Sequence, residues 1–198
     1  MEKSNILNRS VDESRPFLKM RLLTNLFYDS EEDESEFVNR AHYLGMNFVK
    51  GKYVLLLAQI DDYNQWASGI RREENEKICL DICSIACEMG NWVYHIESVP
   101  VDLQTCAVLI SCDSHVPEEL VLNEACAIAE KLIGSVRETL NISISVGVSS
   151  VLSNLGEIKQ GFNDCCDALK KKMYTGKGKV NSKVQDRQAQ DFRLSFEN

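Results

Sequence analysis

The segment Tyr53-Val-Leu-Leu-Leu-Ala-Gln-Ile-Asp-Asp62 is the sequence feature that most constrains the fold. It is an almost continuous apolar run that stops at two carboxylates. Such a run is typical of a strand that is covered by helices on both faces, because no polar residue alternates with the apolar ones. Ligands of open sheets gather where strands end, so this segment predicts both the centre of a domain and the edge where a site would lie.

Two helices are predicted before this strand. Residues 1–15 are polar and predict a frayed lead-in, and Pro16 suits the first turn of a helix. Apolar residues then follow at helical spacing: Leu18, Leu22, Leu23, Leu26 and Phe27. A second helix is expected after Ser30, with an acidic first turn and an end at Gly45. Its apolar stripe is Phe37, Ala41 and Leu44.

The rest of the chain alternates between helices and strands. The predicted helices are Arg72–Met89, Pro117–Leu140 and Gly156–Tyr174. The predicted strands are Trp92–Val99 and Leu103–Ser111, joined as an antiparallel hairpin, then Asn141–Ser149 and a short strand near Lys179–Val184. Together with the first strand, this gives the order β-α-β-β-α-β-α-β behind an N-terminal helical pair. The order predicts an α+β, ferredoxin-like fold, with helices packed on the sheet.

We expect three regions along the chain. Residues 1–48 form an N-terminal helical segment that serves as a linker or in dimerisation, residues 49–184 form the main domain, and residues 185–198 form a polar tail or linker.

Composition excludes several classes of function. The net charge of −8 argues against direct contact with nucleic acid, which needs a basic surface. No stretch has the apolar length of a signal peptide core or a membrane span, so a cytoplasmic location is expected. The eight cysteines contain no Cys-x-x-Cys pair, and in a reducing compartment they act as small apolar residues. A structural zinc site is therefore not expected.

Near the C-terminus, Ile144–Val148 and Cys165–Val180 resemble the closing strand, helix and glycine turn of GGDEF domains. The helix of that family typically reads Ala-Asp-x-Ala-Leu-Tyr-x-Ala-Lys-x-x-Gly-x-Asn-x-Val, and the spacing fits without a gap. The positions that keep the pattern are Ala168, Leu169, Gly176 and Val180, whereas Lys170, Lys172 and Gly178 depart from it. The resemblance covers about residues 50–184 and implies a GGDEF-like fold.

The same resemblance implies that the catalytic positions are replaced. The first aspartate of the family's opening strand, a magnesium ligand in active cyclases, falls on Gln59. The asparagine that reads guanine and the aspartate after it fall on Ala67 and Ser68, and the signature hairpin falls on Asp102–Cys106. The inhibitory Arg-x-x-Asp site of the family would lie at Val93 and Ile96.

Phosphoryl transfer explains why these replacements matter. The reaction needs carboxylates that hold Mg²⁺ and a glycine turn that lets backbone amides approach the phosphates. Gln59 and Thr105 are neutral, and Leu103 brings a side chain to the turn. We therefore expect no catalytic residue, no metal and no cofactor: a degenerate GGDEF-like domain.

A narrower resemblance joins three further segments: Arg40-Ala-x-x-Leu-Gly45, Tyr53-Val-Leu-Leu-Leu57 and Gln59–Tyr63. Together with the degenerate core they are similar to the middle region of AraC-type two-component response regulators of Gram-positive bacteria. That region lies between a receiver and a pair of helix-turn-helix motifs. The resemblance implies that these residues are one piece of a longer regulator, which touches DNA only through a domain outside them.

The function expected from these features is a non-catalytic signal-relay domain that acts as a homodimer. We expect the N-terminal helical pair, through Leu18, Leu22 and Leu26, to join two chains. The first alternative is a module that keeps the cleft and senses a small molecule or nucleotide. An active diguanylate cyclase is the second alternative, against which the replaced residues argue.

Several residues remain weak candidates for a site. Asp61 and Asp62 at the strand end and Trp66 in the following loop could contact a ligand, but solvated carboxylates and an indole that covers the core edge are the simpler interpretations. His42, His95 and His115 have no evident partner in the sequence. Cys79, Cys83 and Cys87 share one helix face, and core packing explains them. A basic cluster is most simply a solvated helix end: Lys170, Lys171, Lys172, Lys177 and Lys179.

Overall fold

A computed structural model describes residues 2–28 and 33–182, with side chains from Arg15 onward. The helices are α1 (Glu2–Tyr28), α2 (Glu34–Tyr43), α3 (Tyr63–Trp66), α4 (Arg72–Cys87), α5 (Glu118–Leu140), α6 (Ile158–Lys170) and α7 (Lys172–Thr175), with a 3-10 turn at Leu155–Glu157. The strands are β1 (Gly51–Ile60), β2 (His95–Pro100), β3 (Thr105–Asp113), β4 (Ile144–Val148) and β5 (Val180–Ser182). The α+β order expected from the sequence is confirmed. The expected tail, residues 185–198, lies outside the described residues.

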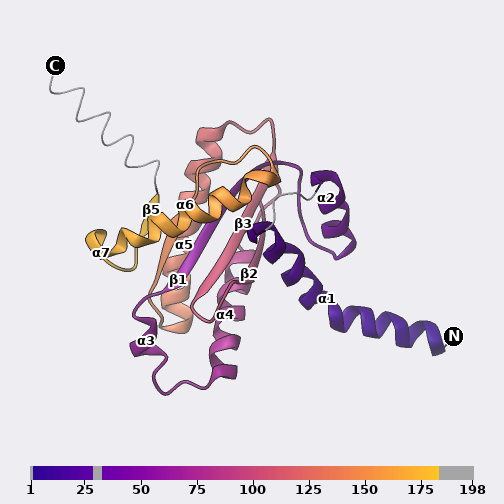
Figure 1. The fold of residues 1–198 in the computed structure, drawn as a ribbon, viewed down its shortest axis with the longest axis horizontal. Helices are drawn as coiled ribbons and strands as arrows, with labels where there is room; N and C mark the ends of the chain where they lie inside the picture. The colour runs from indigo at the N-terminus through magenta and orange to yellow at the C-terminus, as the bar shows by residue number, and fades with distance from the viewer. Residues whose placement is uncertain (1, 29–32, 183–198) are drawn as a thin grey trace.

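The five described strands form one open sheet in the order β2-β3-β1-β4-β5 (Figure 1). β1 is antiparallel to both β3 and β4, and β2 and β3 form the expected antiparallel hairpin. Only β4 and β5 are parallel. The apolar segment that opens the domain is thus the central strand, so its end lies in the middle of one edge of the molecule.

Helices cover both faces of the sheet, as the apolar character of β1 predicts. Val54, Leu56 and Ala58 face one core, which α4 and α5 complete. Tyr53, Leu55 and Leu57 face the other core, which α1, α2 and α6 complete. Every one of these six side chains is almost fully buried. The alternation arises because successive side chains of a strand point to opposite faces.

The N-terminal helices pack on their own domain. Leu22 and Leu26 are 2% and 1% exposed and belong to the core beneath α6, while Leu18 is 38% exposed. Burial of these two leucines inside one chain means that they offer no surface to a second chain. The expected homodimer therefore remains a prediction, and it needs another surface.

The first helix begins earlier than the sequence predicts. α1 starts at Glu2 rather than at Pro16, and Pro16 lies inside it. The prediction of a frayed lead-in over residues 1–15 is wrong for Glu2 onward. The segment before Pro16 contains neither glycine nor proline that would end a helix. An interior proline removes a backbone hydrogen bond and crowds the preceding turn, at a cost of about 3 kcal/mol, and α1 nevertheless continues through Pro16.

The strand after α4 begins later than predicted. Asn91 Oδ1 accepts hydrogen bonds from the amides of Val93 and Tyr94, at 2.8 and 2.9 Å. This side chain holds the segment in a turn, so β2 begins at His95 instead of Trp92. Such local bonds from asparagine compete with strand pairing.

A glycine explains how closely α6 approaches the sheet. A Cβ atom added at Gly147 of β4 would lie 2.5 Å from the carbonyl oxygen of Cys165 on α6. The close backbone approach expected at this position is confirmed. It brings the C-terminal end of α6, and with it Lys172, over the end of β1.

Candidate functional site

The candidate site lies at the end of β1, where three strands meet. Gln59 is directly opposite Thr105 on β3 and Ser145 on β4. The two neutral residues at which the family resemblance implies lost function, Gln59 and Thr105, are therefore cross-strand neighbours.

Asp61 is buried in a cradle of hydrogen-bond donors. Its side chain accepts bonds from Ser143 Oγ at 2.7 Å, from Ser145 Oγ at 2.7 Å and from the amide of Gly178 at 3.0 Å. The residue is 5% exposed. The expectation of a solvated carboxylate is wrong for Asp61, because Ser143 just before β4, Ser145 within β4 and the turn before β5 enclose it and supply the three donors.

Lys172 places an ammonium group at the same strand end. Its Nζ donates to Gln59 Oε1 at 2.5 Å and lies 3.7 Å from Asp61 Oδ1. The Lys172 side chain is 22% exposed, so it does not belong to a solvated helix end, and this part of the basic-cluster interpretation is wrong. The lysine faces inward because α7 follows α6 directly and lies over the end of the sheet.

Asp62 and Trp66 do not join this arrangement. Asp62 has a left-handed backbone (φ 50°) and makes an exposed ion pair with Lys177, so its solvated interpretation is supported. Trp66 is half-buried against the core, and its ring lies 6.2 Å from that of Tyr63. This supports a role for Trp66 in covering the core edge. The structure therefore does not bring Asp61, Asp62 and Trp66 together in one site.

The hairpin between β2 and β3 is closed by its own contacts. The amide of Gln104 donates to Asp102 Oδ1 at 2.8 Å, and the Cys79 thiol approaches the carbonyl oxygen of Leu103 at 3.4 Å. A hydrogen bond with Cys106 lowers the pKa of the Cys79 thiol, and the same contact raises the pKa of Cys106. Cys79 thus supports the hairpin from α4 below, in line with the packing role expected for it.

The magnesium ion that the family resemblance implies does not fit these residues. Mg²⁺ prefers carboxylate and phosphate oxygens. Here Gln59 supplies a neutral oxygen that already accepts a bond from the Lys172 ammonium, and the oxygens of Asp61 accept bonds from serines and an amide. Within residues 15–28 and 33–182, no group of three histidine, cysteine or acidic side chains could hold a metal. We derive no step through a metal.

Two cavities adjoin Gln59 and Lys172. The larger, about 500 Å³, lies between the hairpin, α6 and the end of α1, and it is lined by Tyr28, Phe162 and Met173 among others. The smaller, about 280 Å³, lies toward α3 and is lined by Asn64, Gln65 and Gln104 among others. Two cavities thus adjoin the strand end.

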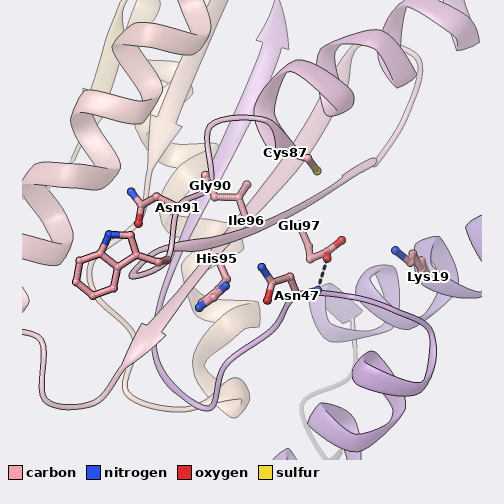
Figure 2. A pocket seen from close by; sticks show the side chains of 9 residues that line it. Lys19, Asn47, Cys87, Gly90, Asn91, His95, Ile96 and Glu97 are labelled. Atoms are coloured by element: carbon pink, nitrogen blue, oxygen red, sulfur yellow. Dashed lines mark hydrogen bonds between the residues drawn. The ribbon is translucent and has the colours of Figure 1, made fainter.

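A third cavity, of about 600 Å³, lies at the free edge of β2 (Figure 2). Four segments line it: α1, the connection from α2 to β1, the end of α4 with its following turn, and β2. The lining residues are Lys19, Asn47, Cys87, Gly90, Asn91, Trp92, His95, Ile96 and Glu97. It includes Ile96, one of the two positions at which the family's inhibitory site would lie.

The other histidines lie elsewhere. His42 Nε2 is 2.6 Å from the carbonyl oxygen of Phe48, and His115 Nδ1 is 2.5 Å from Asp113 Oδ1 on the surface. Only His95 lines one of the cavities described above. His42 and His115 therefore have partners that the sequence did not reveal.

Sequence reasoning missed the partners of Asp61 and Gln59. Ser143 and Ser145 are two residues apart in the predicted closing strand, Asn141–Ser149, which predicts a shared face, but only the strand order places that face beside Asp61. Lys172 stands where the family pattern has alanine. A lysine at a position that normally carries a small residue was the available signal for an inward-facing cation.

Comparisons with known proteins agree with this architecture. The family model described as a GGDEF-like domain matches residues 29–170. A search of curated proteins found no match.

Solved structures are similar at low identity. The active GGEEF domain of a diguanylate cyclase from Vibrio cholerae is 15% identical, with a TM-score of 0.54 and coverage of 79% of this chain and 93% of that one. The diguanylate cyclase SiaD from Pseudomonas aeruginosa, solved with its activator SiaC, is 17% identical, with a TM-score of 0.53 and coverage of 90% and 66%. The GGDEF domain of PA1120 from Pseudomonas aeruginosa is 11% identical, with a TM-score of 0.51 and coverage of 75% and 89%.

These likenesses concern the fold alone, and the family model supplies the assignment, since it covers more than half of the residues. This chain belongs to the family of GGDEF-like domains.

Proposed function

We propose that this chain is a non-catalytic signal-relay domain of a bacterial transcriptional response regulator. In this proposal the domain is degenerate, resides in the cytoplasm, acts as a homodimer and contacts DNA only through another domain of the same longer chain. The family assignment is compatible with a regulatory domain.

The observation that carries the proposal is the contact between Lys172 and Gln59. In an active cyclase the strand end must collect negative charge to hold Mg²⁺ against the triphosphate. Here the strand end carries a neutral amide, and a fixed ammonium group lies 2.5 Å from it. A divalent cation at this place would be repelled by Lys172, and like charges at such separations are strongly unfavourable in a partly buried site.

The test is a turnover assay of residues 1–198 with GTP and Mg²⁺, in which the products are separated by mass spectrometry. We expect no cyclic dinucleotide, while an active GGDEF domain measured in parallel forms it. Product that grows linearly with the concentration of this chain would overturn the non-catalytic assignment.

A second candidate function rests on the two cavities beside Gln59. A module that senses a nucleotide or another small molecule could use this cleft without catalysis, with the exposed Asp62 among the residues that line the smaller cavity. Calorimetry with GTP and with cyclic dinucleotides distinguishes this candidate from a pure relay. Saturable heat that Lys172→Ala alters would support the sensing function, and an absence of heat would exclude it.

The response-regulator context has its own test. We expect the reading frame around these residues to encode a receiver upstream and paired helix-turn-helix motifs downstream. A frame that encodes neither would contradict this part of the proposal and leave the non-catalytic part standing.

A further inference from the structure

We infer that the cavity at the free edge of β2 binds a small zwitterion of the amino-acid class, with its ammonium group on Glu97 and its carboxylate on Lys19. The cavity is separate from the end of β1, and none of its lining residues belongs to the two cavities beside Gln59. The inference does not depend on the proposed relay function.

Opposite charges line this cavity from different elements. Lys19 comes from α1 and Glu97 from β2, and both side chains point toward the same open space (Figure 2). Lys19 is close enough to lower the pKa of Glu97, yet among the described side chains no ion pair joins the two. A lysine and a glutamate that face one cavity without pairing leave room for a molecule that carries the complementary pair of charges.

Glu97 is held in position by the backbone. Its Oε1 accepts a hydrogen bond from the amide of Asn47 at 2.8 Å, which Figure 2 shows as a dashed line. Burial is the main cause of a raised pKa for this carboxyl. A cationic partner stabilises the charged form of a half-buried carboxylate whose pKa is raised in this way, because the partner replaces the interactions with water that burial removed.

Lys19 is positioned by the turn after α2. Its Nζ donates to the carbonyl oxygen of Gly45 at 3.2 Å, which leaves further donor hydrogens on the ammonium group for a ligand. The same turn continues to Asn47, so one segment sets the positions of both charged groups.

A buried polar atom supports a ligand at this place. His95 Nδ1 is buried and has no hydrogen-bond partner among the described residues. Buried polar atoms without partners are rare, and a bound water or ion is one explanation for them. His95 and Asn47 both line the cavity, so they are placed to contact the side chain of the ligand.

Other ligand classes fit less well. An anion such as phosphate would meet the carboxylate of Glu97, and a simple cation would meet the ammonium group of Lys19. A purely apolar ligand would leave both charges desolvated and unpaired, which is costly. A zwitterion is the class whose charges match both.

The experiment is calorimetry of residues 1–198 with the twenty standard amino acids and γ-aminobutyrate. For the tightest ligand, its methyl ester and its N-acetyl derivative are then titrated. On the unmodified chain, we expect the free amino acid to bind at least about tenfold more tightly than either derivative, because each derivative loses one charge-assisted contact.

Charge variants assign each contact. Glu97→Gln should weaken the free amino acid and the methyl ester at least about tenfold and leave the N-acetyl derivative unchanged. Lys19→Gln should weaken the free amino acid and the N-acetyl derivative at least about tenfold and leave the methyl ester unchanged. Glu138→Gln and Lys131→Gln, at exposed positions of α5, make the same chemical changes elsewhere and should have no effect.

Three results would overturn the inference: no heat with any member of the panel, equal affinity for the free and derivatised forms, or an affinity that neither charge variant changes. Unfolding curves of both variants show whether they fold. If either does not, the comparison of derivatives on the unmodified chain decides alone.

Discussion

Asp61 should contribute far more to stability than its neighbour Asp62, although both carry the same side chain at the same strand end. Asp61→Asn keeps the size of the side chain and removes its charge. One of the two oxygens becomes an amide nitrogen, so the three donors from Ser143, Ser145 and Gly178 share a single acceptor oxygen. Lys172 also loses the nearby carboxylate.

The magnitude follows from these contacts. A hydrogen bond to a charged group contributes about 1.5–3 kcal/mol, and a buried donor left without a partner costs a similar amount. We expect Asp61→Asn to lower the free energy of unfolding by about 2–3 kcal/mol. Asp62→Asn tolerates the same left-handed backbone and removes only the exposed pair with Lys177, so its cost should stay below about 1 kcal/mol.

Urea unfolding followed by circular dichroism measures both variants. Hydrogen exchange adds a local readout, because Gly178 lies just before β5, and the amides of Val180–Ser182 should exchange faster in Asp61→Asn only. Equal destabilisation by the two variants would refute the reasoning, since it would mean that the cradle around Asp61 contributes no more than a surface ion pair.

The other predictions concern packing, assembly and pH. Gly147→Ala should lower the free energy of unfolding by about 1–3 kcal/mol, because its new Cβ meets the carbonyl oxygen of Cys165. Gly134→Ala, which has open space around it in α5, should be neutral or stabilising by up to about 1 kcal/mol. Thermal unfolding of both variants measures the difference. Leu22→Ala should lower stability by about 2–4 kcal/mol without changing the mass measured by light scattering, whereas Leu18→Ala should change stability by less than about 1 kcal/mol. A mass that falls only in Leu22→Ala would support the predicted dimer interface on the N-terminal helices. Burial and a hydrogen bond to Glu34 raise the pKa of Tyr53, so stability should be lost above about pH 10, the unfolded value, and Tyr53→Phe should lessen that loss; the same slope in both proteins would contradict this.

Much of the fold could be predicted because the local sequence patterns agree with the way the strands and helices pack in the whole domain. The apolar run from Tyr53 predicted a strand covered on both faces, and Gly147 predicted a close approach between backbones. The starts of α1 and β2 were missed for local reasons: a helix that continues through Pro16, and an asparagine side chain that holds Tyr94 in a turn.

The site was harder to predict because its contacts join distant segments. Asp61 and Ser143 are separated by 82 residues, and Gln59 and Lys172 by 113. A sequence pattern shows that a carboxylate follows a strand, but only the strand order shows that serines enclose it and that a lysine faces its neighbour. The cavity at β2 depends on four segments in the same way.

The central claim is that Lys172 and Gln59 close the strand end to a divalent cation. The most direct measurement is the broadening of side-chain amide signals in NMR spectra when Mn²⁺ is added in the presence of GTP. We predict that the Gln59 side-chain signal keeps its intensity at Mn²⁺ concentrations that broaden exposed acidic sites. Selective loss of the Gln59 signal at the lowest Mn²⁺ concentration would contradict the account.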